Sequence, residues 1–340
     1  MRKLLNTLYV TTPEAYLYKD GLNVVVSAKQ QELFRIPILN IESIVTFGYM
    51  GASPGLMKLC MDNNVSLTFL SPQGRFISRF QGATKGNVLL RTRQYGLSSD
   101  QGFSLHLSRL FIGGKIQNYR NILRRFIRDH GMDTEVEKVV SRLDGTKRLL
   151  LGAQGADEIR GIEGEAATAY FSVFPRLILH QKDQFPFRGR NRRPPKDAVN
   201  AMLSFVYTLI ANDVTSALET VGLDPYVGFL HAIRPGRASL ALDMMEELRA
   251  YLGDRLVLSL INRKQVTGKD FFSQADESVL MTDSCRKELV SSWQNRKKEM
   301  ITHPYIGEKI PIGLLPYVQA MLMARYIRGE VDDYPVFLVQ

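Results

Sequence analysis

The segment Pro194-Pro-Lys-Asp-Ala-Val-Asn-Ala-Met-Leu-Ser-Phe-Val-Tyr-Thr-Leu-Ile210 sets a long apolar run directly after two prolines and an aspartate. Proline in the first turn and aspartate at the cap are typical of a helix start. The segment therefore predicts a strongly apolar helix from about Ala198. No apolar run in the chain approaches the roughly 18 residues that a membrane span needs, so we expect a globular protein and no membrane association.

Helical spacing of apolar residues begins near Leu89 and continues to the last dozen residues, whereas the preceding part alternates in the manner of strands. This change predicts the domain organisation. We expect an α+β protein, with a β-rich N-terminal domain over residues 1–88 and a larger all-α domain over residues 89–340.

Turn and cap signals organise the N-terminal part. Two strand-like runs flank Asp20-Gly21, which predicts a hairpin. Further strands are expected at Ile36–Phe47, at Val65–Leu70 and at Arg75–Phe80. Ser53-Pro54 predicts one short helix, with serine as its cap and proline in its first turn.

The charge balance favours a polyanionic partner, because 44 Lys and Arg residues stand against 34 Asp and Glu residues, for a net charge of +10. Nucleic acid is the leading candidate, and an ordinary basic protein is the alternative. Two segments concentrate the basic residues. Residues 104–130 predict a solvated basic helix face interrupted by Gly113-Gly114, and residues 182–196 predict a basic loop between two helices.

Neither the start of the chain nor its two cysteines indicate export. The basic start of the chain lacks a cleavage site, so we expect no signal peptide. Cys60 and Cys285 lie far apart in the sequence, which suits neither a disulfide framework nor a zinc motif. We expect two buried thiols in a reducing cytoplasm.

The segment Gly228-Phe-Leu-His-Ala-Ile-Arg-Pro-Gly-Arg-Ala-Ser-Leu-Ala-Leu-Asp-Met-Met-Glu-Glu247 joins a histidine, a turn with arginines and a helix with three acids. We expect His231 to end one helix and Ser239 to cap the next. Asp243, Glu246 and Glu247 repeat at helical spacing, and a solvated acidic face is the simplest interpretation. Glu247 is expected to face solvent or an arginine.

Glu163 differs from the other acids in its surroundings. If its segment is helical, it shares a face with Ala166, Ala167 and Tyr170, whereas Glu165 projects away. A carboxylate on a packing face requires a cation, because burial of an unpaired charge is costly. We expect that cation to be an arginine or a metal ion.

Two carboxylates and one imidazole suit a divalent ion. Carboxylate oxygens favour Mg²⁺, and a neutral histidine shifts the preference toward Mn²⁺. The sequence spacing does not by itself bring Glu163 and His231 together.

Four motifs in order resemble the CRISPR-associated adaptation integrases, the Cas1 family, over essentially the whole chain. They are Arg160-Gly-Ile-Glu163-Gly, Arg192-Arg-Pro-Pro-Lys-Asp197-Ala-Val-Asn200, Leu223-Asp-Pro-Tyr-Val-Gly-Phe-Leu-His231 and Ser239-Leu-Ala-Leu-Asp243-Met-Met-Glu246. The general likeness suggests a type I system, subtype I-C.

The resemblance implies a metal-dependent DNA integrase and endonuclease. The three metal ligands would fall on Glu163, His231 and Glu246, with Mg²⁺ or Mn²⁺ as the cofactor. Asp243 would be a fourth catalytic acid beside the site and would hold a metal-bound water or accept a proton. The last ligand is Asp in some members, and Glu keeps oxygen ligation with a longer arm. The implied reaction is attack by the free 3′-hydroxyl of a short duplex on a phosphodiester at the edge of a CRISPR repeat.

The resemblance also implies partners: a homodimer, and the small protein Cas2, which bridges two such dimers. The turn residue Arg234 and three residues of the basic loop would contact DNA phosphates without reading sequence, namely Arg188, Arg190 and Arg193. The tail at residues 332–340 is compatible with Cas2 docking, although packing on its own domain is favoured slightly.

Two other functions stay open. One is a repair-type nuclease that acts on branched DNA, and the other is a non-catalytic basic scaffold whose acids form a solvated helix face.

Overall fold

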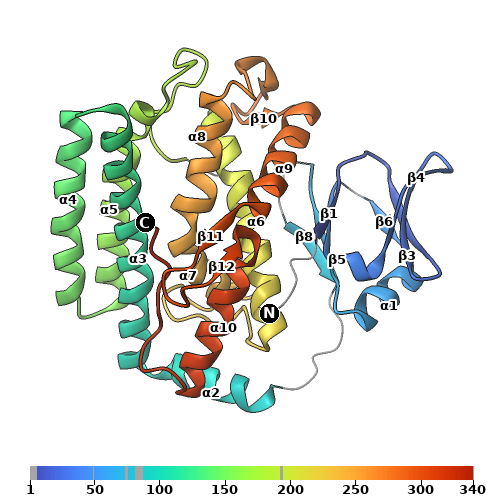
Figure 1. The fold of residues 1–340 in the computed structure, drawn as a ribbon, viewed down its shortest axis with the longest axis horizontal. Coiled ribbons are helices and arrows are strands. Elements are labelled where there is room, and N and C mark those ends of the chain that lie inside the picture. Colours follow the sequence, from blue (N-terminus) through green and yellow to red (C-terminus); the bar gives the residue numbers. More distant parts are fainter. Residues whose placement is uncertain (1–5, 49, 73–75, 81–86, 192–193, 340) are drawn as a thin grey trace. The chain divides into compact units, whose positions relative to one another are not determined.

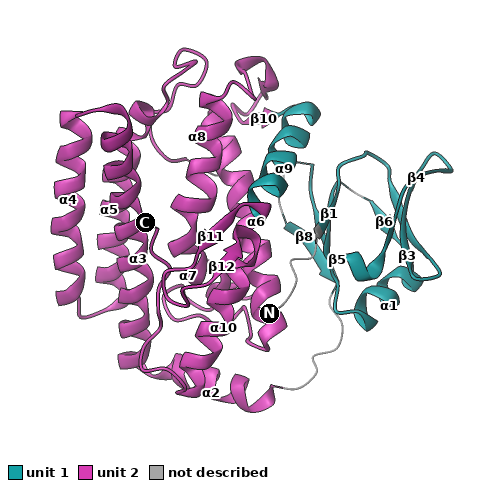
Figure 2. Ribbon diagram, viewed as in Figure 1, with its two compact units in different colours: residues 1–86, 281–297 teal, residues 87–280, 298–340 magenta. Residues whose placement is uncertain are grey.

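Two compact units divide the chain (Figure 2). The computed structural model describes residues 6–48, 50–72, 76–80, 87–191 and 194–339. The first unit comprises residues 1–86 together with 281–297, and the second comprises residues 87–280 together with 298–340. A strand-rich region is followed by a helical one, which confirms the predicted α+β class.

The first unit contains two four-stranded sheets (Figure 1). One has the order β1-β5-β7-β8, in which the β1–β5 and β5–β7 pairs are parallel and the β7–β8 pair is antiparallel. The other has the order β4-β3-β2-β6. The strands are β1 (Asn6–Val10), β2 (Tyr16–Asp20), β3 (Asn23–Ala28), β4 (Gln31–Pro37), β5 (Ile41–Phe47), β6 (Gly51–Ala52), β7 (Ser66–Leu70) and β8 (Phe76–Phe80).

The local signals in this unit act as predicted. β2 and β3 form an antiparallel hairpin around Gly21, whose φ of +56° suits glycine. Ser53 caps α1 (Pro54–Asp62) by accepting the Leu56 N–H at 3.1 Å. Of the strand expected at Arg75–Phe80, the structure describes Phe76–Phe80 as β8, and Arg75 lies outside the described part of the chain. Cys60 is buried, and so is Cys285, as expected.

Helix α9 (Asp283–Lys298) is the one segment from late in the chain that belongs to the strand-rich unit. Its Trp293 indole donates to the Tyr9 hydroxyl at 3.1 Å, and the Gln294 amide donates to the Thr7 carbonyl at 2.5 Å. The predicted helical domain over residues 89–340 included this segment. Helical periodicity identifies a helix but does not reveal which unit its buried face packs against.

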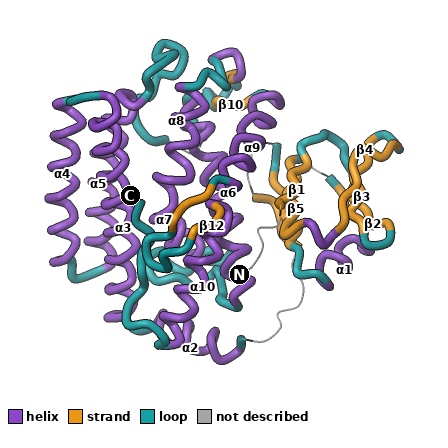
Figure 3. Tube along the Cα trace, viewed as in Figure 1, coloured by secondary structure: helices purple, strands orange, loops and turns teal. Residues whose placement is uncertain are grey.

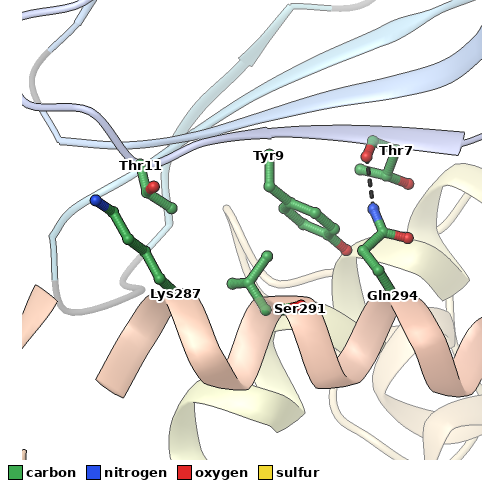
Figure 4. A pocket seen from close by; sticks show the side chains of 7 residues that line it. Thr7, Tyr9, Thr11, Lys287, Ser291 and Gln294 are labelled. Carbon is green, nitrogen blue, oxygen red and sulfur yellow. Dashed lines mark hydrogen bonds between the residues drawn. The ribbon is translucent and has the colours of Figure 1, made fainter. Parts of the chain in front are cut away.

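A small hollow of about 280 Å³ lies between β1 and α9 (Figure 4). Its lining includes Thr7, Tyr9, Thr11, Lys287 and Gln294, and the dashed line in Figure 4 is the bond between Gln294 and Thr7. The lining combines hydroxyl groups and one amine without any acidic residue, so it offers no set of metal ligands.

The second unit is built from helices, which Figure 3 shows in purple, with two short hairpins, β9–β10 and β11–β12. The long helices α3, α4 and α5 lie side by side (Figure 1). The helices are α2 (Val88–Ser99), α3 (Gln101–His130), α4 (Thr134–Gly152), α5 (Ala156–Leu177), α6 (Ala198–Val221), α7 (Ser239–Leu248), α8 (Arg255–Asn262) and α10 (Leu315–Arg328), and the short strands are β9 (Phe271–Ser273), β10 (Val279–Met281), β11 (Met300–Thr302) and β12 (Lys309–Pro311).

Helix α6 is the apolar helix expected after the two prolines. Asp197 caps it by accepting the Asn200 N–H at 2.8 Å. The helix is long and apolar enough to pass a compositional test for a membrane span, but 67% of that window is buried inside the protein. Because α7 and α10 pack against it, α6 is the core helix of its unit.

Helix α3 runs without interruption through Gly113-Gly114, contrary to the expected break. Gly114 serves close packing instead, since a Cβ at this position would collide with Val336 of the C-terminal tail. The tail passes beside α3, where the Asn118 amide donates to Phe337 O at 2.9 Å and its oxygen accepts the Val339 N–H at 2.9 Å. Packing of the tail on its own unit is thereby confirmed.

Candidate active site

Three helices of the second unit bring one lysine between two glutamates. Lys115 on α3 forms an ion pair with Glu163 on α5, and its Nζ lies 2.8 Å from Glu246 Oε2 on α7. Only 2% of the Lys115 side chain is exposed, compared with 32% for Glu163 and 3% for Glu246. The cation expected beside Glu163 is therefore a lysine rather than an arginine.

Glu246 contacts a second cation at its other oxygen. Arg249, one turn further along the chain, places Nη2 2.9 Å from Glu246 Oε1. Burial acts to raise the pKa of Glu246, but the positive charges of Arg249 and Lys115 outweigh it and hold the pKa at about 2. Glu246 is therefore an anion at neutral pH despite its burial.

Asp243 holds the loop that carries His231. One carboxylate oxygen accepts the His231 N–H at 2.9 Å and His231 Nδ1 at 2.6 Å, and the other accepts the N–H groups of Phe229 and Leu230 at 2.7 and 3.0 Å. Because a carboxylate only accepts, Nδ1 is the donor to Asp243, and Nε2 is the ring nitrogen left for another partner. Asp243 is fully buried, so its role in this geometry is to orient the imidazole.

Two expectations about this stretch are wrong. α6 ends at Val221, and His231 lies in an irregular loop rather than at a helix end. Ser239 is the first residue of α7 and does not cap it, because its hydroxyl donates to Ala232 O at 3.1 Å. The hydrogen bonds from the loop to Asp243 replace the backbone pairing that a helix end would have supplied.

Glu247 was expected at the surface, and this expectation is also wrong. Its side chain is fully buried beneath the C-terminal tail. It accepts hydrogen bonds from the Tyr334 hydroxyl at 2.5 Å, the Phe337 N–H at 2.5 Å and the Gln319 amide at 3.1 Å. Burial raises the pKa of Glu247 to about 7 despite these donors.

Two arginines, one of them the partner of Glu246, lie over the ring of Tyr207. The Tyr207 ring has the guanidinium of Arg249 at 5.1 Å from its centroid and that of Arg190 at 5.3 Å. Its hydroxyl donates to Asp254 Oδ1 at 2.5 Å. Burial raises the pKa of Asp254 to about 6. This stack connects the basic loop to the residues around Glu246.

The four arginines predicted to contact DNA have different settings. Arg188 and Arg234 are exposed, and Arg234 lies in a turn in which its carbonyl accepts the Arg237 N–H at 3.1 Å. Arg190 binds inward, because it donates to Asn200 Oδ1 at 2.5 Å and to Ser204 Oγ at 3.1 Å. Arg193 falls outside the described residues. Their contacts with DNA stay a prediction.

The donor set fits a divalent ion in its chemistry. Two carboxylates converge on one buried positive charge, and Glu246 Oε2 receives no aligned hydrogen bond from the described residues. His231 adds an imidazole nitrogen, held in place by Asp243. In the described part of the chain, however, no three His, Cys, Asp or Glu side chains are arranged to enclose an ion. Lys115 supplies the positive charge between the glutamates.

Sequence analysis missed Lys115 because it was counted as part of a solvated basic face. A signal was present: Lys115 stands four residues from Phe111 and from Tyr119, within a stripe of buried residues. A lysine within an apolar stripe indicates a buried carboxylate on a neighbouring helix. Arg249 carried a similar signal, three residues after Glu246 on the same helical face.

The fold and site define a class: proteins that join a strand-rich unit to a helical unit holding a cluster of carboxylates, an imidazole and basic side chains. A sequence model of the family described as "CRISPR associated protein Cas1" matches residues 8–295. The chain belongs to this Cas1 family.

Named relatives agree with this assignment. The chain is 51% identical to "CRISPR-associated endonuclease Cas1 1" of Chlorobaculum tepidum over 99% of both chains, and 47% identical to "CRISPR-associated endonuclease Cas1 2" of Rhodospirillum rubrum over 98% of both chains. These identities cover both units, so the similarity extends to the strand-rich unit as well as to the candidate site.

Solved structures show the same fold. A CAS1 protein from Thermotoga maritima has a TM-score of 0.84 at 21% identity, with 97% of this chain and 100% of that chain covered. A casposase bound to its integration product has a TM-score of 0.84 at 21% identity, with 98% and 93% covered. A chain of a Cas6-RT-Cas1–Cas2 complex has a TM-score of 0.85 at 18% identity, and this chain matches 37% of that longer one.

Proposed function

We propose that this protein is a divalent-metal-dependent DNA integrase and endonuclease of CRISPR adaptation. It would insert short duplex DNA into a CRISPR array by 3′-hydroxyl attack on a phosphodiester at the repeat edge. The observation that carries the proposal is the convergence of Glu163 and Glu246 on one buried positive charge, with His231 oriented by Asp243. Membership of the Cas1 family and the names of the curated relatives support it.

The metal ligands in this proposal are Glu163, His231 and Glu246. A bound Mg²⁺ or Mn²⁺ supplies a Lewis acid for the phosphodiester. Asp243 holds the proton on His231 Nδ1 and thereby directs the Nε2 lone pair away from itself. Arg249 keeps Glu246 ionised and, through Tyr207, fixes the helix that presents it.

Exposed arginines would bind the DNA phosphates next to this site. Arg188 and Arg234 are accessible and suit bidentate contacts with phosphate. Contact between Arg193 and DNA phosphate is proposed from the sequence alone. Arg190 would position the loop by its bonds to Asn200 and Ser204.

The proposal includes a homodimer formed through the strand-rich unit. β4 is an edge strand of its sheet, and the side chains of Leu33 and Phe34 on it are exposed. An exposed apolar edge strand is a surface on which a second copy can pair. Cas2 is the further proposed partner, supported by the complex in which a similar fold occurs. The expected compartment is the cytoplasm.

A strand-transfer assay tests the proposal. It combines a labelled duplex with free 3′-hydroxyl ends, a plasmid that carries a CRISPR repeat, purified Cas2 and Mn²⁺, Mg²⁺ or EDTA. Glu163→Ala, His231→Ala and Glu246→Ala should each abolish insertion in either metal. The matched controls are Glu165→Ala, whose exposed carboxylate pairs with Arg142, and the exposed His180→Ala. Both controls should insert DNA like the wild type.

The same assay separates the other functions. Insertion by a folded His231→Ala protein, or insertion in EDTA, would overturn the proposal. Cleavage of branched duplexes without insertion at the repeat would indicate a repair-type nuclease. DNA binding that is insensitive to EDTA and leads to no strand cleavage would indicate a scaffold.

A further inference from the structure

Lys115 stands where the proposed site requires a cation. Its ammonium contacts one oxygen of Glu163 and lies 2.8 Å from Oε2 of Glu246. These are two of the three side chains proposed as metal ligands. An ammonium at this position blocks the approach of both carboxylates to a common ion, which accounts for the lack of a ready three-ligand group among the described residues.

The charges of the four paired side chains around Glu246 balance without any other ion. Lys115 and Arg249 contribute two positive charges, and Glu163 and Glu246 contribute two negative charges. Asp243 is engaged with the His231 loop and adds no free oxygen. A divalent ion added beside Lys115 would set four positive charges, with those of Lys115 and Arg249, against the three carboxylates of Glu163, Glu246 and Asp243 in a largely buried place, which is energetically unfavourable.

We propose that Lys115 is a built-in competitor of the metal ion, and that a divalent cation binds only when the Lys115 ammonium leaves its position between Glu163 and Glu246. This inference rests on the proposed metal site. Lys115 would keep the buried Glu246 paired while no metal is bound, and it would keep metal affinity low until DNA phosphates add negative charge. It is therefore a positioning residue for the two glutamates, and it sets the metal affinity.

The side chain is suited to such a movement. A lysine ammonium is a point charge on a flexible four-carbon stem, so it can change partners without a change in the backbone. The ammonium itself lies over the Tyr119 ring, with Nζ 5.8 Å from the ring centroid. Glu163 is the more exposed of the two glutamates, so the ammonium can move away from Glu246 toward solvent on the Glu163 side.

Direct titration with Mn²⁺ in the absence of DNA tests the inference, by calorimetry and by the electron paramagnetic resonance signal of free Mn²⁺. Lys115→Met removes the charge and keeps a stem of similar length. It should bind one Mn²⁺ roughly tenfold or more tightly than the wild type, because a like charge has left the site. Lys115→Arg keeps the charge and should bind Mn²⁺ as weakly as the wild type.

Thermal melting gives a second readout. In EDTA the Lys115→Met protein should melt below the wild type, because Glu246 has lost a buried partner, and Mn²⁺ should raise its melting temperature more than that of the wild type. Lys147→Met on α4 is the matched control, because its ammonium is exposed and donates to the Gln117 amide oxygen at 2.8 Å rather than to a carboxylate. It should change neither measurement.

Two further variants make the result decisive. If Lys115→Met does not fold, Lys115→Gln replaces it with a neutral polar side chain. A Glu163→Gln substitution in the Lys115→Met background should cancel the gain in affinity. An unchanged or weakened Mn²⁺ affinity in the folded Lys115→Met protein would contradict the proposed competition between Lys115 and the metal ion. A failure of both the wild type and Lys115→Met to bind Mn²⁺ would contradict it as well. Strand transfer by the wild type is measured separately, so the proposed function can hold while this inference fails.

Discussion

One oxygen of the Asp243 carboxylate accepts two hydrogen bonds from His231, one from its backbone N–H at 2.9 Å and one from Nδ1 at 2.6 Å. Backbone and side chain of the same residue are thus fixed by one acceptor on α7. The second oxygen holds the two preceding N–H groups. Because Asp243 and Glu246 lie on the same helix, α7 fixes the position of the His231 imidazole relative to the Glu246 carboxylate.

Asp243→Asn should loosen the His231 loop and misplace its imidazole. The asparagine amide offers one acceptor oxygen where the carboxylate offers two, so buried N–H groups of the loop lose their partner. We expect the free energy of unfolding to fall by about 2 to 4 kcal/mol, and strand transfer to fall by at least about tenfold. Urea denaturation and the strand-transfer assay measure the two effects. The exposed Asp157→Asn should stay within about 0.5 kcal/mol of wild type, and a wild-type stability of Asp243→Asn would contradict this account.

Gly228 leaves room for the Asp243 carboxylate beside the His231 loop. A Cβ at position 228 would lie 2.6 Å from Asp243 Oδ2 and 2.7 Å from the Ser239 carbonyl carbon. Gly228→Ala should therefore destabilise the protein by about 2 kcal/mol or more in urea denaturation. Gly145→Ala on α4 meets nothing within 4 Å and should instead stabilise by about 0.5 to 1 kcal/mol. Equal effects of the two substitutions would refute the steric argument.

Sequence patterns predicted those features that depend on neighbours in the chain. The hairpin around Gly21, the Ser53 cap and the Asp197 cap all follow from contacts within a few residues. The change from strand to helix near residue 88 lies close to the start of the second unit at residue 87. The packing of α9 with β1 was not predictable, because periodicity carries no information on the distant partner.

The candidate site shows the same limit. Glu163 was singled out because small and aromatic residues share its face, and the structure pairs it with a buried cation. The identity of that cation depended on α3, whose Lys115 lies 48 residues earlier in the chain. Glu247 was misjudged because its burial is caused by the tail, which reaches it from 87 residues away through Tyr334.

The tail should stabilise the second unit through its buried side chains. Phe337 is buried, its N–H donates to Glu247, and its ring lies 5.6 Å from that of Tyr251. Phe337→Ala should lower the free energy of unfolding by about 3 to 5 kcal/mol. The adjacent Leu338 is exposed, so Leu338→Ala should change it by less than about 1 kcal/mol. Similar melting curves for both variants would show that the tail is not held as described.

The free energy of unfolding should depend on pH through the protonation of the buried acids. Burial raises the pKa of Glu247 to about 7 and that of Asp254 to about 6. An acid with a raised pKa binds its proton more tightly in the folded protein than in the unfolded chain. Its contribution to the free energy of unfolding therefore declines as the pH rises from the pKa of the unfolded chain to the pKa of the folded protein. For Glu247 the decline should extend from about pH 4.5 to about pH 7. Glu246 acts oppositely, since its pKa of about 2 makes its contribution complete above about pH 4.5.

Glu247→Gln isolates this effect from the histidines that titrate in the same range. At pH 5 the buried carboxyl is protonated, and its hydroxyl oxygen can still accept a hydrogen bond, whereas the glutamine NH2 only donates and would face the Phe337 N–H or the Tyr334 hydroxyl. The variant should therefore be less stable than the wild type at pH 5. Because glutamine does not ionise, the gap in free energy of unfolding should narrow steadily between pH 5 and pH 7 and then stay constant. Urea denaturation at half-unit steps of pH measures the gap. Glu165→Gln, at an exposed carboxylate, should show no such trend, and a gap for Glu247→Gln that stays constant from pH 5 to pH 7 would mean that Glu247 is already ionised at pH 5 in the folded protein.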